Sequence, residues 1–353
     1  MWMRMGLLVG CSKAPQYCMN IDTLTCVLSK IFGQTIFHAG YQTKQIQEDR
    51  DNLWVVTGIA ETDSGDKLPY KVIFKVVKKA ECLVDPDTGR REYDLYMSHF
   101  GSLFIDGLRW PKCFHAEMNA EGTETQLWLE YIDGVSGHDL TVEMLERVAY
   151  EIGRFQGRLY AEQPFILRDI PNLSKSNIQK GYYNLRRSQK KFYDFIRSDN
   201  CGIPEHLCKM LIDMDENADD VWNRIEQLPV VLCHRDVWME NIFYLNGEVV
   251  LIDWDTTGWG YLGEDIACLI ADEADYEYML DRYRRCVPAY FRGFSEYADT
   301  SHVSDPCIFE QILLMYGYKL VEWYLKASEA NWAEAETLNI NTLQKICEMR
   351  SIL

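Results

Sequence analysis

The stretch that decides the fold is CHRDVWMEN, residues 233–241 of this 353-residue chain. Twelve residues after Asn241, Asp253 stands in VLIDWD, residues 250–255. The apolar runs 230–233 and 249–252 read as buried strands that lead into these two polar segments. Polar residues on a loop or at a strand end are then held by a rigid scaffold, as a preorganised site requires.

Three residues of these segments suit phosphoryl transfer. Asp236 can accept the proton of an attacking alcohol, while Asn241 and Asp253 offer the hard oxygen ligands that Mg²⁺ prefers. A His-x-Asp pair occurs by chance in many proteins, and a lone carboxylate after a strand is often only a helix cap. The prediction therefore depends on the combined spacing and on both flanking strands.

The HxDxxxxN spacing with a second Asp resembles the catalytic and metal-binding loops of the eukaryotic-like kinase superfamily. Here the metal Asp lies in IDWD, residues 252–255, and GYLGEDIA follows at residues 260–267. This pairing resembles the aminoglycoside phosphotransferase and choline kinase family, which phosphorylates small molecules. The resemblance implies an α+β, bilobal protein-kinase-like fold, with a small antiparallel-sheet N-lobe of five strands and a mainly helical C-lobe.

The resemblance also assigns supporting residues around the chemistry. His234 is expected to brace the catalytic loop, and Asp265 to hydrogen-bond the backbone of that loop. Asp255 stands where protein kinases carry glycine, and it can assist the metal or the acceptor.

A kinase site needs a lysine for the nucleotide phosphates, and Lys75 in the strand-like run 70–78 matches the strand-3 lysine of kinases. The alternative is that Lys71, Lys75 and Lys78 only solvate one strand. Seventeen residues on, Glu92 opens a helical pattern and matches the acid that pairs with this lysine. Asp94 is the competing acid.

The strand 126–132 with Gly134 resembles the hinge between the lobes. Glu130 and Ile132 are placed at the adenine by position alone, because backbone groups dominate there. The stretch 40–52, where protein kinases carry GxGxxG, has one glycine, which disfavours a protein kinase. Its acids Glu48, Asp49 and Asp51 would repel phosphates unless they face solvent.

Length and composition favour two lobes. We expect residues 1–130 to form a nucleotide-binding lobe and residues 131–353 a catalytic and acceptor-binding lobe. Residues 1–18 have an apolar core of about five residues, short of the roughly 7–15 of a signal peptide, so we interpret them as a disordered or dispensable extension. Twelve scattered cysteines without CxxC pairs indicate a reducing cytosol, hence a cytoplasmic protein.

The net charge of -18 disfavours nucleic acid and anionic membranes as partners, and it favours cationic small molecules. No run of the sequence reaches transmembrane length. Segments 272–278 and 316–324 mix acids with aromatic residues, which can bind an ammonium group at about 0.5–2 kcal/mol per ring. An amphipathic helix with core aromatics gives the same pattern. The acceptor-binding candidates are Trp238, Glu240, Asp255, Asp272, Glu322 and Trp323.

The sequence therefore predicts a small-molecule kinase that transfers the γ-phosphoryl of ATP or GTP, with Mg²⁺, to a hydroxyl of an aminoglycoside-like, choline-like or sugar or nucleoside acceptor. Two alternatives outside the kinases stay open. A nucleotide-binding pseudokinase or regulatory module would keep the fold without turnover. A metal-dependent hydrolase would use His234, Asp236, Asp253 and Asp255 but would leave Lys75 idle.

Overall fold

The computed structural model describes residues 19–46, 52–79, 82–198, 201–272, 276–303 and 307–352. The extension 1–18, the acids of segment 47–51 and residues 273–275 lie outside the described residues.

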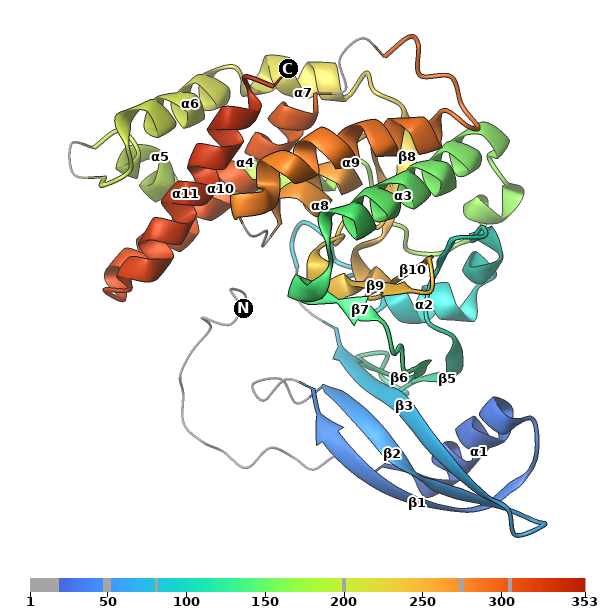
Figure 1. The fold of residues 1–353 in the computed structure, drawn as a ribbon. Coiled ribbons are helices and arrows are strands. Elements are labelled where there is room, and N and C mark those ends of the chain that lie inside the picture. The colour runs from blue at the N-terminus through green and yellow to red at the C-terminus, as the bar shows by residue number, and fades with distance from the viewer. Residues whose placement is uncertain are drawn as a thin grey trace.

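The N-terminal lobe is built on the five-stranded antiparallel sheet that the sequence predicts (Figure 1). Its order is β1-β2-β3-β6-β5, and helix α1 (Ile21–Phe32) begins after Asn20, whose side chain accepts a hydrogen bond from the backbone N–H of Asp22. The strands are β1 (Ile36–Gln45), β2 (Leu53–Thr62), β3 (Lys67–Lys78), β5 (Cys113–Met118) and β6 (Glu124–Glu130).

Strand β3 carries the period-two pattern that fixes where Lys75 points. Tyr70, Val72, Phe74 and Val76 are buried in a cluster with the apolar face of α1. Successive side chains of a strand face opposite sides of the sheet, so Lys75 projects from the other face, toward helix α2 (Arg91–Met97).

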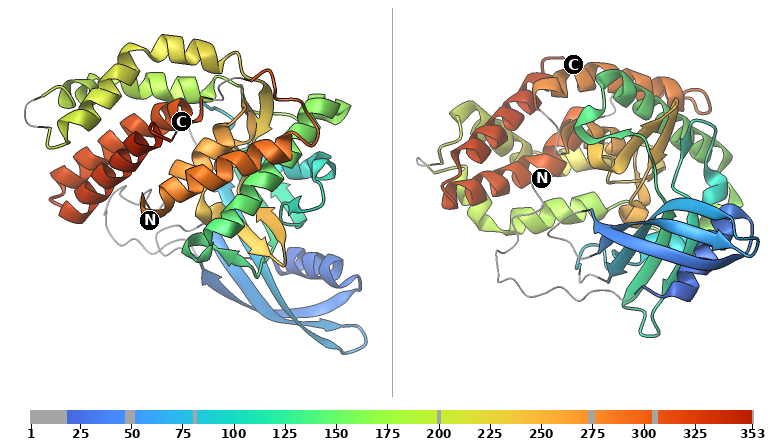
Figure 2. Two further views of the ribbon diagram at one scale, coloured as in Figure 1. Left: turned by 45° about the horizontal axis from the view of Figure 1, so that its top comes forward. Right: turned by 60° about the horizontal axis from the view of Figure 1, so that its bottom comes forward.

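The C-terminal lobe is mainly helical, and the helices gather at the end of the molecule away from the sheet in both views of Figure 2. Within the described ranges, no helix combines the length and the apolar composition that crossing a bilayer requires. The helices are α3 (Val142–Glu162), α4 (Ile178–Ser188), α5 (Lys190–Phe195), α6 (Glu205–Glu216), α7 (Ala218–Ile225), α8 (Glu264–Ala271), α9 (Met279–Phe294), α10 (Ile308–Glu329) and α11 (Ala333–Met349). Single 3-10 turns are η1 (Phe100–Leu103), η2 (Gly137–Asp139), η3 (Phe165–Arg168), η4 (Met239–Asn241), η5 (Trp254–Thr256) and η6 (Tyr276–Tyr278).

Helices α3 and α9 form the closest helix pair of this lobe, side by side in Figure 1. A Cβ at Gly153 would lie 2.1 Å from the carbonyl oxygen of Tyr290, and a Cβ at Gly293 would lie 2.1 Å from that of Tyr150. Glycine is therefore required at both contact points, because any side chain would separate the backbones.

Short strands position the polar loops between the lobes. Strand β8 (Val230–Cys233) pairs with β11 (Gly258–Tyr261), and β9 (Ile242–Leu245) pairs with β10 (Glu248–Leu251). Strands β4 (Leu108–Arg109) and β7 (Val135–Ser136) complete the second small sheet. The HRD loop, residues 234–241, thus follows β8, and the DWD loop, residues 253–257, follows β10.

Two hydrophobic clusters divide the molecule. The smaller holds the sheet and α1, and the larger holds the helical lobe. Leu95, Phe100, Leu103 and Leu108 belong to the larger cluster, although they precede residue 130. Helix α2 therefore packs with the helical body while it contacts β3 through Lys75, and the chain division at residue 130 stays a prediction.

Candidate functional site

Lys75 joins two acids from distant parts of the chain. Its Nζ lies 2.5 Å from Oε2 of Glu92 and 2.9 Å from Oδ1 of Asp253. The side chains of Lys75 and Glu92 are 14% and 3% exposed, whereas that of Asp253 is 43% exposed. The buried pair therefore holds the lysine in place, and the Asp253 carboxylate stays accessible to a bound group.

The attraction between the charges of Lys75, Glu92 and Asp253 opposes the free-energy cost of burying them. Burial by itself would lower the pKa of Lys75, but the carboxylates of Asp253 and Glu92 outweigh it and hold the pKa above its ordinary value. Burial raises the pKa of Glu92 to about 7, against the opposing effect of the Lys75 charge. Lys75 is thus a fixed cation at neutral pH.

The competing residues face elsewhere. Lys71 is exposed and places its Nζ 3.5 Å from the ring centroid of Tyr131, and Lys78 is exposed as well. Asp94 accepts a hydrogen bond from Nε of Arg90 at 3.0 Å. Of the candidate lysines and acids on β3 and α2, the structure brings together Lys75 and Glu92.

Asp236 and Asn241 meet within the HRD loop. The side-chain N–H₂ group of Asn241 donates to Oδ2 of Asp236 at 2.7 Å and to its backbone carbonyl at 2.9 Å, which leaves Oδ1 of Asn241 as the atom that could ligate a cation. Burial raises the pKa of Asp236 to about 8, and the charges of Asp253 and Asp272 add to the effect. Asp236 is therefore a stronger base than an ordinary carboxylate.

His234 links the two loops. Its Nε2 lies 3.0 Å from the carbonyl oxygen of Ile252, and its Nδ1 accepts the backbone N–H of Asp236 at 3.2 Å. Burial lowers the pKa of His234 to about 4, so the ring is neutral, with the proton on Nε2. This geometry suits a brace between the loops and leaves no free ring nitrogen for a general base.

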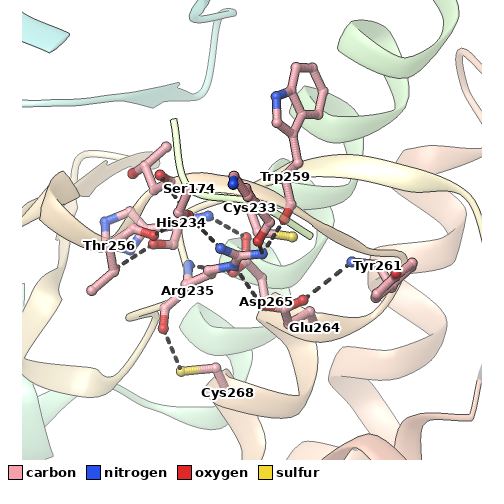
Figure 3. A network of polar contacts seen from close by, with 12 residues as sticks. Ser174, Cys233, His234, Arg235, Thr256, Trp259, Tyr261, Glu264, Asp265 and Cys268 are labelled. Carbon is pink, nitrogen blue, oxygen red and sulfur yellow. Dashed lines mark hydrogen bonds and ion pairs between the residues drawn. The ribbon is translucent and has the colours of Figure 1, made fainter. Parts of the chain in front are cut away.

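Asp265, at the start of α8, accepts hydrogen bonds from the backbone of the HRD loop (Figure 3). Its carboxylate accepts the N–H of His234 at 2.9 Å, the N–H of Arg235 at 2.7 Å and the side-chain amide of Gln156 at 2.8 Å. Burial raises the pKa of Asp265 to about 7, although these backbone donors pull it down. Three donors fix the carboxylate where the loop leaves β8.

Arg235 is a residue whose role the sequence analysis missed. It has φ 70°, is buried, and its Nε donates to Oε1 of Glu264 at 2.7 Å. Its guanidinium also donates to the hydroxyl of Ser174 and to the carbonyl oxygen of Trp259 (Figure 3). Arg235 lies in the segment 233–241 and Glu264 in the segment 260–267. An arginine in the first motif and an acid next to Asp265 in the second are the sequence signal that indicates this ion pair.

Asp255 is tied to the segment before α2. Its Oδ2 accepts the backbone N–H of Gly89 at 2.7 Å, and its carbonyl oxygen accepts a hydrogen bond from Arg91. Arg91 is fully buried and also donates to Asp85 at 3.0 Å. Burial raises the pKa of Asp255. These hydrogen bonds hold the DWD loop against the start of α2, next to the contacts of Lys75 with Glu92 and Asp253.

The two hinge residues differ in their surroundings. The Glu130 carboxylate accepts a hydrogen bond from Arg109 at 2.7 Å and another from the backbone N–H of Lys112 at 3.0 Å. Ile132 is 7% exposed and follows the end of β6. The Glu130 side chain is thus engaged within the protein, so a nucleotide contact at this position is left to the backbone.

The acceptor candidates fall into separate groups. Trp238 is half-buried and Glu240 is exposed, both on the HRD loop. Asp272 and Trp323 come together around Lys319, whose Nζ lies 2.7 Å from Asp272 and 4.7 Å from the Trp323 ring centroid. Glu322 instead pairs with Lys326 at 2.8 Å and with Arg186 at 3.8 Å.

A family model and a curated relative match this chain. The family model described as "Phosphotransferase enzyme family" matches residues 75–301, more than half of the chain. Choline kinase B1 of Caenorhabditis elegans is 30% identical over 138 residues, which span 35% of this chain and only 35% of that protein.

Solved structures of related folds cover nearly the whole chain. A microcompartment-associated aminopropanol kinase matches with a TM-score of 0.53 and 13% identity, over 92% of this chain and 95% of that one. Choline kinase from Cryptosporidium parvum Iowa II matches with a TM-score of 0.51 and 16% identity, over 88% and 90%. Wild-type aminoglycoside 2'-phosphotransferase-IIIa matches with a TM-score of 0.51 and 11% identity, over 93% and 98%. At such identity these structures show the fold alone. The family model, which matches residues 75–301, shows that the chain belongs to the phosphotransferase enzyme family.

Proposed function

We propose that this chain is a small-molecule kinase that transfers the γ-phosphoryl group of ATP or GTP to a hydroxyl of its acceptor. One observation carries the proposal: the Lys75 ammonium contacts both Glu92 and the exposed carboxylate of Asp253. Lys75 would bind the nucleotide phosphates, because a fixed cation stabilises the charge that they develop during transfer.

The donor set around the DWD loop fits Mg²⁺. Asn241 and Asp253 would hold the ion through hard oxygen atoms, and one carboxylate oxygen of the neighbouring Asp255 is buried without a hydrogen-bond partner among the described residues. No group of three or more His, Cys, Asp or Glu that could hold a metal occurs in the described part of the chain, so phosphate oxygens and water would complete the shell. When bound, the ion neutralises charge on the phosphates.

Asp236 would accept the proton of the acceptor hydroxyl. Its pKa of about 8 brings its basicity close to the working pH, which is where general-base catalysis is most effective. The amide of Asn241 orients the carboxylate, and His234 and Asp265 fix the backbone on either side of it. These contacts support a loop that is positioned before any substrate binds.

The nucleotide, the acceptor class and the cellular location complete the proposed function. Glu130 and Ile132 would border the adenine or guanine ring. GTP is proposed as a phosphoryl donor alongside ATP, because the solved structure of aminoglycoside 2'-phosphotransferase-IIIa is a GDP complex. Aminoglycoside-like, choline-like and sugar or nucleoside alcohols are the acceptor classes. A cytosolic location rests on the cysteines, since those in the described ranges are thiols rather than disulfides.

Two other functions compete less well. A metal-dependent hydrolase would leave the contacts of Lys75 with Glu92 and Asp253 without a purpose. A nucleotide-binding pseudokinase would tolerate loss of the base, yet Asp236 is held by Asn241 in an ordered loop.

The test is a nucleotide-consumption screen with ATP and GTP, with and without Mg²⁺, against amine-bearing alcohols, aminoglycosides, sugars and nucleosides. Acceptor-dependent release of ADP or GDP, matched by a phosphorylated product in mass spectrometry, supports the kinase. Nucleotide binding with no turnover of any acceptor would favour the pseudokinase instead.

A further inference from the structure

One lysine of the C-terminal lobe lies between a carboxylate and two aromatic rings. Lys319 on α10 pairs with Asp272, which follows the last turn of α8, with Nζ and Oδ1 2.7 Å apart. The same ammonium lies 4.7 Å from the ring centroid of Trp323 and 5.1 Å from that of Tyr316. A carboxylate and two rings around an ammonium are what a protein offers to an amine ligand. We call these four residues the Lys319 cage.

The Lys319 cage lies beside the proposed base. Cys268 bridges the two, because its Sγ contacts Oδ2 of Asp272 at 3.8 Å and the carbonyl oxygen of Arg235, the neighbour of Asp236, at 3.9 Å. The charge of Asp272 raises the pKa of Asp236, and that of Lys319 lowers it. An acceptor hydroxyl presented to Asp236 would therefore bring its neighbouring atoms against the cage.

The pair is held firmly enough to act as a fixed group. The side chains of Lys319 and Asp272 are only 13% and 12% exposed. A second ammonium beside Lys319 would meet an equal charge at short range in a partly desolvated site. It could enter only by displacing Lys319 from Asp272, which would leave that lysine to be solvated elsewhere.

We propose that Lys319 is a specificity-determining residue that excludes amine alcohols and selects an uncharged polyhydroxyl acceptor of the sugar or nucleoside class. This inference rests on the proposed kinase function and narrows its acceptor. The ammonium has N–H donors beyond the single hydrogen bond that it makes among the described residues, and the carboxylate of Asp272 accepts. Adjacent hydroxyls match such a neutral donor and acceptor pair. An anionic group would meet Asp236 and Asp253 instead.

The first experiment tests the cage without turnover. Tetramethylammonium is titrated into the full chain and into Lys319→Ala and Lys319→Gln, with binding followed by calorimetry. We expect no saturable binding to the wild type and binding at least about tenfold tighter in Lys319→Ala, because one carboxylate and two rings become free. If Lys319→Ala fails to fold, Lys319→Gln, which removes the positive charge but keeps a polar side chain of similar length, takes its place.

The matched control is Lys326→Ala on the same helix. Lys326 is 50% exposed and pairs with Glu322 outside the cage, so this variant should bind tetramethylammonium as the wild type does. Equal affinity of the wild type and both Lys319 variants for tetramethylammonium would overturn the inference.

The second experiment uses the acceptor screen. The ratio of kcat/KM for polyhydroxyl over amine acceptors should fall by at least about tenfold in Lys319→Gln and stay unchanged in Lys326→Ala. A wild type that prefers choline-like alcohols, or a ratio that Lys319→Gln does not change, refutes the proposed specificity while the kinase function stands. Absence of any turnover refutes the kinase function, and the titration still decides whether Lys319 blocks a cation site.

Discussion

Lys75 and Asp253 are 178 positions apart in the sequence, yet Nζ of one lies 2.9 Å from Oδ1 of the other. Lys75 belongs to the five-stranded sheet and Asp253 follows β10 beside the helical lobe. The contact therefore joins the proposed phosphate-binding cation to the proposed metal ligand, and the phosphates of a bound nucleotide would compete with Asp253 for the lysine.

Replacing Lys75 by alanine should lower kcat/KM for the nucleotide by about 10²–10³, because one preorganised charge on the transferring group is lost. The buried carboxylate of Glu92 loses its partner, so the variant should also be less stable than the wild type, and its folded fraction is measured before the kinetics are compared. Steady-state kinetics with the best acceptor of the screen measures the effect.

Lys71→Ala is the matched control, because Lys71 lies on the same strand and is exposed over Tyr131. Its kinetics should stay close to the wild type. Equal losses of kcat/KM in both variants would mean that the lysines only solvate the strand. Full activity in Lys75→Ala would favour the metal-dependent hydrolase over the kinase.

Asp236→Asn should lower turnover by about 10²–10⁴, the usual effect of losing a general base, with little change in nucleotide affinity. The amide is nearly isosteric, so the loop should keep its shape. Product formation under saturating nucleotide and a separate nucleotide titration give the two quantities. Asp219→Asn, an exposed change on α7, serves as the control. Unchanged turnover in Asp236→Asn would reject its assignment as the base.

The same substitution should stabilise the fold, and more so at higher pH. Asp236 has a pKa of about 8 in the folded chain and an ordinary value of 3.8, so between these values the folded state holds a proton that the unfolded state releases. The free energy of unfolding of the wild type therefore falls as pH rises through this window, whereas the amide of the Asp236→Asn variant does not titrate. Denaturant unfolding of both proteins from pH 4 to pH 8 should show a gap that widens by at most about 1.4 kcal/mol per pH unit. A constant gap would show that the pKa of Asp236 is ordinary.

Regular periodicity made much of the fold predictable. The stripe of Leu145, Val148, Ile152, Phe155 and Leu159 is buried along α3, and the alternation of β3 is as expected. Apolar positions at helical spacing continue from α6 into α7, but the two helices are separated at Asn217, whose φ of -105° and ψ of 12° depart from the helix.

Ion pairs between residues far apart in the sequence limit what can be predicted of the remaining structure. Helix α2 ends at Met97 and buries Arg91, Glu92 and Asp94 with Leu95, because partners on β3 and in the loops before and after it neutralise the charges. Periodicity cannot reveal such partners. The pattern of segment 316–324 likewise cannot reveal the partner of Lys319, since its contact with Asp272 spans 47 positions.

Asp265→Ala should reduce the free energy of unfolding by about 2–4 kcal/mol, because the buried N–H groups of His234 and Arg235 lose their acceptor. Denaturant unfolding measures it. Asp220→Ala, exposed on α7, should change little. If Asp265→Ala is as stable as this control, the HRD loop does not depend on the carboxylate.

Glu130→Ala separates the two possible roles of the hinge residue. The carboxylate accepts hydrogen bonds from Arg109 and from the backbone of Lys112, so its loss should cost about 1–2 kcal/mol of unfolding free energy at this partly exposed position. Nucleotide affinity should stay nearly constant, because the side chain faces Arg109 and a base at the hinge would be recognised by backbone groups. Glu121→Ala, in the exposed turn between β5 and β6, is the control for both measurements. A large loss of nucleotide affinity with unchanged stability would mean that the Glu130 carboxylate leaves Arg109 to bind the base, and that the hinge rearranges when the nucleotide enters.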